Sequence, residues 1–206
     1  MMELIAAHRR ALADALGTLS AAQWRSPSLC AGWTAAHVLA HQTMPFRISE
    51  ADFMAGLQRC GGDFTKFSDE VAERDSQLPA AELVEVLRAN ADSPWSPPGG
   101  GLAGALTHDV IHGLDIAWPL SLGYHIPEQA ARTVLELLTS TGSETVFGFP
   151  LDGIRVTATD LAWSSGDGAE LAGQSRDLIP LLAGRAVPHQ SFDGQGAARA
   201  WSLAAR

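Results

Sequence analysis

The chain has little cysteine. Only Cys30 and Cys60 occur among its 206 residues, and they form no CxxC pair. Two cysteines allow one bridge but are too few for a disulfide framework. The sequence therefore argues against a small secreted fold that depends on disulfide bonds for its stability.

Long apolar runs and an excess of positive charge are also missing. No stretch approaches the roughly 18 uninterrupted apolar residues of a membrane-spanning helix. The N-terminus does not have the basic-then-apolar order of a secretory signal, so we expect a cytoplasmic protein. There are 14 Lys and Arg residues against 23 Asp and Glu residues, which gives a net charge of −9. This charge disfavours nucleic acids and anionic membranes as partners.

Hydrophobic residues make up 46% of the chain and charged residues 18%, as in ordinary globular proteins. In the first part of the chain, apolar residues recur at helical spacing. We expect helices over residues 3–17, 34–45, 49–58, 64–74, 80–90, 102–118 and 127–138. A capping box at Ser20 predicts a further short turn. Pro45 is expected to kink or end its helix, and residues 93–101 form a Pro/Gly-rich loop.

The pattern changes after Pro150. Residues 154–160 alternate and include β-branched side chains, which predicts a strand that residues 162–164 could continue or pair with. A shorter run at 170–172 precedes a helix expected over 175–183. The sequence therefore predicts a mainly α fold, with a helical domain over residues 1–148 and a small α/β domain over residues 149–206.

Histidine carries the clearest functional signal. Two pairs share one spacing, His37 with His41 and His108 with His112. Residues four apart lie on one face of a helix, so each pair can offer two imidazole ligands to a cation such as zinc. Helical bundles build metal sites from such residues on facing helices. Asp115 follows on the same face and could bind the metal or orient an imidazole.

The spacing alone leaves two interpretations open. In one, the paired histidines hold a metal ion. In the other, they are core residues with ordinary hydrogen-bond partners, and the protein is a non-catalytic module that binds a small apolar ligand. The remaining histidines have no such context and are expected to be solvated; they are His8, His125 and His189.

Three groups of motifs resemble one known family, the mycothiol-dependent maleylpyruvate isomerases. The first group is LSAAQW at 19–24, SPSLCAGWT at 26–34 and VLAH at 38–41. The second is LTHDVIHGLDIA at 106–117. The third is VTATD at 156–160, with LLAGR at 181–185. The resemblance covers nearly the whole chain and implies an up-and-down helical bundle of the DinB-like, or YfiT-like, metalloenzymes.

The resemblance also implies a divalent metal, usually zinc, held by three side chains. The family ligands match His41 and His112, and the third ligand position is His108. Many family members have a carboxylate there, so this chain resembles the three-histidine version of DinB-like relatives. His37 falls where many members have Asp, which implies a supporting role, as for Asp115. Arg185 is a candidate to bind a substrate carboxylate.

The family uses mycothiol as a thiol cosubstrate at the open position of its metal. The thiol can add to a small electrophile and leave again, which isomerises the substrate, or it can stay attached, which is S-transfer. A hydrolase that uses metal-bound water is a further alternative. Neither cysteine lies in a histidine motif, so we expect the reactive sulfur to come with the cosubstrate. The expected partner is a small-molecule substrate, and the chain is a monomer or a homodimer.

Overall fold

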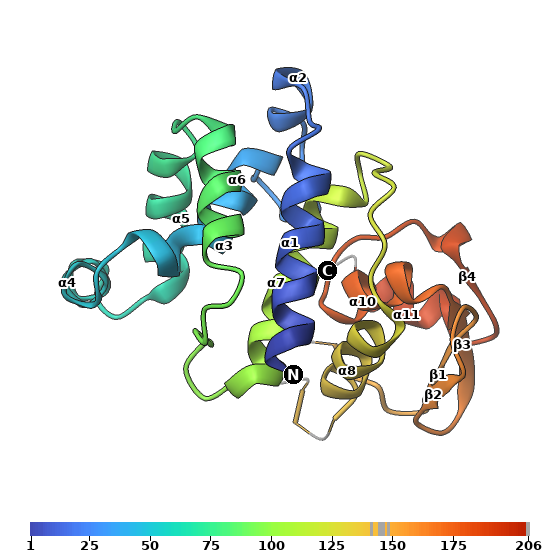
Figure 1. The fold of residues 1–206 in the computed structure, drawn as a ribbon. Helices are drawn as coiled ribbons and strands as arrows, with labels where there is room; N and C mark the ends of the chain where they lie inside the picture. Colours follow the sequence, from blue (N-terminus) through green and yellow to red (C-terminus); the bar gives the residue numbers. More distant parts are fainter. Residues whose placement is uncertain (141, 144–146, 148, 205–206) are drawn as a thin grey trace. The chain divides into compact units, whose positions relative to one another are not determined.

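The computed structural model describes residues 1–140, 142, 143, 147 and 149–204 (Figure 1). The chain forms two compact units. One consists of Met1–Ser96 and Asp115–Tyr124, and the other of Pro97–Leu114 and His125–Arg206. The predicted domain boundary falls at residue 148, which lies outside the described residues, so the division into residues 1–148 and 149–206 stays a prediction.

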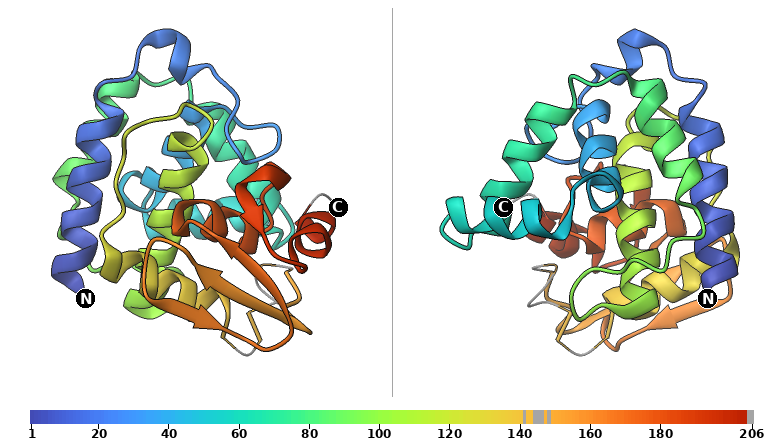
Figure 2. Two further views of the ribbon diagram at one scale, coloured as in Figure 1. Left: turned by 90° about the vertical axis from the view of Figure 1, so that its right-hand side faces the viewer. Right: turned by 60° about the vertical axis from the view of Figure 1, so that its left-hand side comes forward.

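The first unit is helical. Its helices are α1 (Met2–Leu16), α2 (Ala21–Trp24), α3 (Ala35–Arg47), α4 (Glu50–Arg59), α5 (Phe64–Asp75), α6 (Ala80–Ala89) and the end of α7 (Gly101–Ala117). Helix α3 packs against both α5 and α6, and α6 packs in turn against α1 (Figures 1 and 2). Helix α3 therefore has packed neighbours on two sides.

The local sequence explains why these helices form. In α1 the apolar residues Ile5, Leu12 and Leu16 recur on one face and are fully buried. The predicted capping box is present at α2, where the Ser20 side chain accepts a bond from the Gln23 N–H. Pro45 was expected to kink or end its helix; it does not end the helix, because α3 continues to Arg47.

The second unit contains the small sheet. Its elements are α7 up to Leu114, α8 (Glu128–Leu138), β1 (Ile154–Ala158), β2 (Trp163–Ser165), β3 (Ala169–Gly173), α10 (Ser175–Leu182), a 3-10 turn (His189–Ser191), β4 (Phe192–Asp193) and α11 (Ala197–Ala204). Helix α10 packs on α8, and α11 contacts β3. The strands, orange in Figure 2, lie beside these red C-terminal helices. The predicted fold class, mainly helical with a small sheet near the C-terminus, is confirmed.

The sheet has the strand order β2-β1-β3-β4. Strands β1 and β3 are parallel, with Val156 opposite Leu171, and the outer strands are antiparallel to them. Buried and more exposed side chains alternate along β1 as predicted, and Ile154 and Val156 are fully buried. The strand stops at Ala158, two residues early, because the Asp160 carboxylate is used elsewhere. It accepts bonds from the backbone N–H and the hydroxyl of Ser175, the first residue of α10.

Two properties follow from this arrangement. Among the described residues, no helix is both long and apolar enough to cross a bilayer. The histidine motif lies on one continuous helix, α7, whose bounds agree closely with the predicted helix over 102–118.

Gly168 is a position where the backbone requires glycine. Its φ angle is 125°, and an added Cβ would lie 2.3 Å from the carbonyl oxygen of Gly153. We expect Gly168→Ala to lower the free energy of unfolding by roughly 2 kcal/mol and the melting temperature by roughly 4–8 °C. Gly123→Ala is the control, because its Cβ would meet nothing within 4 Å. Equal melting temperatures for the two variants, measured by circular dichroism, would contradict the assignment.

Candidate metal centre

Helix α7 carries two of the three candidate metal ligands. His108 and His112 are half-buried, and their ring centroids are 4.8 Å apart, edge to face. His108 Nδ1 lies 3.1 Å from Oδ1 of Asp109, a residue only 1% exposed. Because this carboxylate takes the Nδ1 side of the ring, a metal ligand from His108 would be Nε2. Asp109 is thus a supporting residue that the sequence analysis missed.

The same face of α7 borders a cavity in the second unit. The cavity measures about 640 Å³ and is lined by His108, His112, the loop 97–100 and Arg185. The Arg185 side chain donates a bond of 2.9 Å to the carbonyl oxygen of Ala183. The structure therefore brings three of the predicted site residues together around one cavity.

The third candidate ligand, His41, lies in the first unit. It is 8% exposed on α3, and its Nδ1 is 2.8 Å from the hydroxyl of Ser68 on α5. The Trp33 ring packs against the His41 imidazole at a tilt of 53°, with the ring centroids 5.2 Å apart. As with His108, the hydrogen bond at Nδ1 directs any metal bond to Nε2. Ser68 could not be found from the sequence, because nothing in the chain links it to a histidine 27 positions away.

His37 has a different role in the structure. Its Nδ1 is 2.7 Å from the Thr34 hydroxyl, and its Nε2 is 2.9 Å from Oε2 of Glu73. His37 is the third residue of α3 and takes part in the capping box with Thr34. Both ring nitrogens are therefore bonded to neighbouring side chains, and this histidine joins the start of α3 to α5.

Asp115 is fully buried at the end of α7 and belongs to the first unit. The Cys30 thiol donates to its Oδ2 over 3.0 Å, and the Leu29 N–H donates to its carbonyl oxygen over 3.0 Å. The contact between Cys30 and Asp115 was not anticipated from the sequence. The contact was hidden because the two residues are 85 positions apart in sequence.

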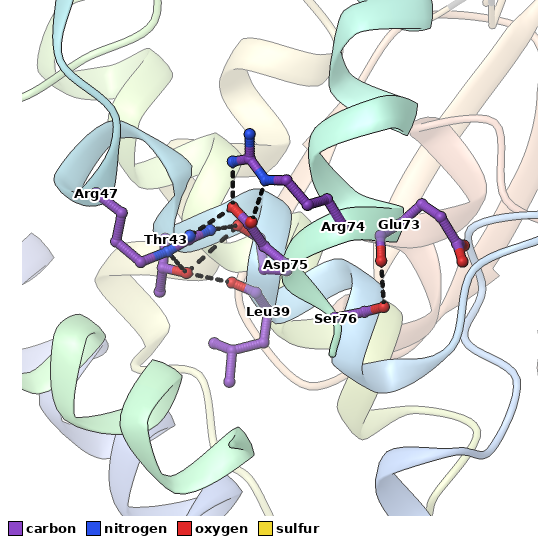
Figure 3. Close-up of polar contacts among 8 residues, drawn as sticks. Leu39, Thr43, Arg47, Glu73, Arg74, Asp75 and Ser76 are labelled. Carbon is purple, nitrogen blue, oxygen red and sulfur yellow. Dashed lines mark hydrogen bonds and ion pairs between the residues drawn. The ribbon is translucent and has the colours of Figure 1, made fainter. Parts of the chain in front are cut away.

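An ion pair with a buried carboxylate joins α3 to α5 (Figure 3). Arg47 Nη1 donates to Asp75 Oδ2 over 2.5 Å, while Nη2 donates to the Ala40 carbonyl over 2.7 Å. Arg74 donates to both carboxylate oxygens of Asp75. Pro45 has no N–H and therefore leaves one backbone hydrogen bond of α3 unmade. The side-chain bonds of Arg47 give the last turns of α3 an additional anchor.

The charges of this cluster shift the ionisation of Asp75. Burial raises the pKa of this carboxyl, but the hydrogen bonds and charges of Arg74 and Arg47 outweigh burial, and the pKa is lowered from its ordinary value. Asp75 is only 5% exposed and the Arg47 side chain 14%, so the ion pair between them is poorly screened by solvent, whereas the Arg74 side chain is exposed. Its carboxylate form therefore contributes to the stability of the α3–α5 pair.

The three remaining histidines divide differently from the prediction. His125 and His189 are exposed, as expected. His8 is fully buried on α1, and its Nδ1 lies 2.7 Å from the hydroxyl of Tyr124, so its predicted exposure was wrong. The hydrogen bond with the Tyr124 hydroxyl offsets the free-energy cost of burying the His8 imidazole, since an unpaired buried polar group costs roughly 1–3 kcal/mol.

Comparison with known proteins confirms the predicted resemblance. Residues 5–94 match the family model of the mycothiol maleylpyruvate isomerase N-terminal domain. Two crystal structures of the mycothiol-dependent maleylpyruvate isomerase, one of a histidine-to-alanine mutant, align with 95% of this chain and 92% of theirs. The TM-scores are 0.58 and 0.57 at 16% identity. No curated protein matches the chain. At this identity the solved structures show a shared fold.

The Asp75 cluster makes stability depend on pH. The folded-state pKa of Asp75 is lowered, so its contribution is complete above the ordinary pKa of about 3.9 and is lost as the pH falls through the folded value. We expect Asp75→Asn to lower the free energy of unfolding by about 2–3 kcal/mol at pH 7. The difference from the wild type should narrow below about pH 4, as measured by urea unfolding.

Asp14→Asn is the matched control, because Asp14 forms an exposed ion pair with Arg88. Such surface pairs contribute about 1 kcal/mol or less. A difference between Asp75→Asn and the wild type that stays constant from pH 7 to pH 3 would show that the ionised carboxylate is not the stabilising form.

Proposed function

We propose that the protein is a metal-dependent enzyme with mycothiol as thiol cosubstrate. The match of residues 5–94 to the mycothiol maleylpyruvate isomerase N-terminal domain supports this proposal. We infer that its helical part is a DinB-like bundle. The reaction is the isomerisation of a small electrophile or an S-transfer to it. The observation that carries the proposal is the histidine set, described next.

The family resemblance makes His41, His108 and His112 the ligands that we propose. Within the second unit, His108 and His112 stand one turn apart on α7, with ring centroids 4.8 Å apart. Zinc takes imidazole nitrogens at about 2.0–2.1 Å, and a three-histidine set with an open fourth position is typical of catalytic zinc. Ser68 and Asp109 hold the Nδ1 sides of two of the rings. The donor set fits a divalent cation, and zinc is the metal that we propose.

A bound cation of this kind lowers the pKa of a thiol that it coordinates. A free thiol with a pKa of about 8.5 is only about 3% thiolate at pH 7. A lowered pKa also weakens the nucleophile, so the two effects partly cancel. The contribution that remains is positioning: the ligating histidines would hold the cation, and with it the thiolate, next to the electrophile.

The substrate would bind in the cavity of the second unit. His108, His112 and Arg185 all line this cavity. A guanidinium stays charged and matches a carboxylate in shape, so Arg185 would bind a substrate carboxylate and orient its electrophilic carbon. The activity in the names of the aligned structures supports isomerisation as the first choice between the two reactions.

Metal content tests the ligand set. Protein purified without a histidine tag should carry about one divalent metal ion per chain, and each of His41→Ala, His108→Ala and His112→Ala should reduce this to less than about a tenth. Mass spectrometry of the elements gives both the stoichiometry and the identity of the metal. His37→Ala and His125→Ala are the controls and should keep the metal, since neither supplies a ligand.

Two results would contradict the ligand set. If wild-type protein bound no stoichiometric metal, the three histidines would be core residues and the metalloenzyme proposal would fail. If His108→Ala kept its metal with a native circular dichroism spectrum, the third ligand would lie elsewhere, and Asp115 would be the first residue to examine.

Thiol dependence tests the chemistry separately. Metal-loaded protein should bind mycothiol in a calorimetric titration, and metal-free protein should bind it at least about tenfold more weakly. Turnover of small electrophilic carboxylic acids, followed by NMR, should need the thiol. Unchanged mycothiol with a rearranged substrate indicates isomerisation, and consumed mycothiol indicates S-transfer. Turnover without any thiol would point instead to hydrolysis by bound water.

A further inference from the structure

We propose that Thr107 determines specificity in the cavity of the second unit, where its hydroxyl donates a hydrogen bond to an oxygen atom of the bound substrate. The inference rests on the substrate-binding role proposed above for this cavity and adds a polar contact to that of Arg185. Thr107 is one of the residues that line the cavity. Its hydroxyl oxygen is buried and has no hydrogen-bond partner among the described residues.

One face of helix α7 borders the cavity. The residues of this helix that line it are Gly104, Thr107, His108, Ile111 and His112. Residues three and four apart lie next to one another on a helix, so these five form a single continuous surface. Thr107 directly precedes His108 in the chain and therefore lies at the same level of this surface. A ligand held beside the two histidines would also lie beside Thr107.

Other threonines of this chain form hydrogen bonds within their own helices. A threonine hydroxyl in a helix can donate to the carbonyl oxygen four residues earlier. Thr43 does so in α3, over 2.7 Å to Leu39, and Thr133 does so in α8, over 2.9 Å to Gln129. Thr107 lies in the interior of α7, yet its hydroxyl makes no such bond to a described residue. The hydroxyl is therefore available to a partner from outside the helix.

Burial makes an unpaired hydroxyl unfavourable. Thr107 is only 2% exposed, so bulk water does not take the place of the missing partner. A valine at this position would have a similar shape without the unpaired polar group. The hydroxyl proton turns about its C–O bond and the side chain about χ1, so the group can adjust to a ligand in the cavity. A ligand oxygen that accepts this hydrogen bond would remove the free-energy cost of the unpaired hydroxyl.

The other polar groups of the cavity indicate which kind of ligand atom Thr107 would contact. Arg185 lines the cavity, and a guanidinium is always charged and only donates hydrogen bonds. No Asp or Glu is among the described residues that line the cavity. The cavity therefore favours an anion with acceptor oxygens, and the Thr107 hydroxyl would act as a donor. The ligand class that we infer is a small carboxylate with a second acceptor oxygen.

A second contact point would orient the substrate. A carboxylate bound to Arg185 alone can still turn about that contact. A hydrogen bond to Thr107 limits this rotation and fixes which part of the substrate lies next to His108 and His112. Restricting a reactant to one orientation lowers the entropic cost of the reaction. Thr107 would therefore select substrates by the position of their second oxygen as well as hold them.

Two acids of nearly the same shape test this contact. 4-Oxopentanoate has a ketone oxygen where 4-methylpentanoate has a methyl group, and neither has an alkene that could react with a thiol. Thr107→Val should weaken binding of 4-oxopentanoate about tenfold, because one buried hydrogen bond is lost. It should not weaken binding of 4-methylpentanoate, and Thr107→Ser should retain the wild-type preference. Arg185→Ala is the control and should weaken both acids, as measured by NMR titration.

Thermal unfolding of the ligand-free protein tests whether the hydroxyl is unpaired. Thr107→Val should leave the melting temperature unchanged or raise it, because the variant removes a buried polar group that has no partner. Thr43→Val is the matched control, since Thr43 is fully buried and its hydroxyl bonds to Leu39. This control should lower the melting temperature by roughly 2–4 °C. Both variants keep a β-branched side chain, so helix propensity changes little.

Two results would overturn the role of Thr107 alone. If Thr107→Val lowered the melting temperature as much as Thr43→Val does, the Thr107 hydroxyl would have a partner within the protein. If Thr107→Val changed the affinities for the two acids by the same factor, the hydroxyl would not recognise the oxygen that distinguishes them. Wild-type protein that bound neither acid would overturn the inference together with the proposed substrate site on which it rests.

Discussion

The site depends on one constraint, which is that polar groups buried on apolar helices need partners. Asp109 and Asp115 are almost fully buried on α7, and His41 is nearly so on α3. An unpaired group in such a place would cost roughly 1–3 kcal/mol. Asp109 contacts His108, Asp115 accepts from Cys30, and His41 contacts Ser68. The bonds that remove these penalties also fix the orientation of the imidazole rings and of the Cys30 thiol.

The same constraint explains how much of the molecule could be predicted from the sequence. Helix positions follow from local periodicity, so α7 and α8 agree with expectation to within one or two residues. The strand at 154–158 follows from its alternation. Its early end does not, because the Asp160 carboxylate is held by Ser175, a residue 15 positions further along the chain. Local patterns specify elements, and contacts distant in sequence decide where some of them stop.

The candidate site divides in the same way. The i, i+4 spacing identified two pairs of histidines, and the family motifs then selected His41, His108 and His112 from them as ligands. These three residues and Arg185 are proposals that metal analysis and ligand binding can test. Ser68 and Cys30 had no signal in the sequence, because their partners lie 27 and 85 positions away. His8 was misjudged for the same reason, since its partner Tyr124 is 116 positions distant. Supporting residues of a site are set by tertiary contacts and are therefore hidden in a single sequence.

The discontinuous first unit affects the order in which the chain can fold during synthesis. Residues 1–96 supply most of its helices, but Asp115–Tyr124 also belong to it. Leu29 and Cys30 form hydrogen bonds with Asp115, and the buried His8 forms one with Tyr124. A nascent chain of 96 residues would therefore leave an imidazole and a thiol in the unit without these partners. The ribosome must release residue 124 before the first unit can close, by which time the loop 97–100 and most of α7 have already been made.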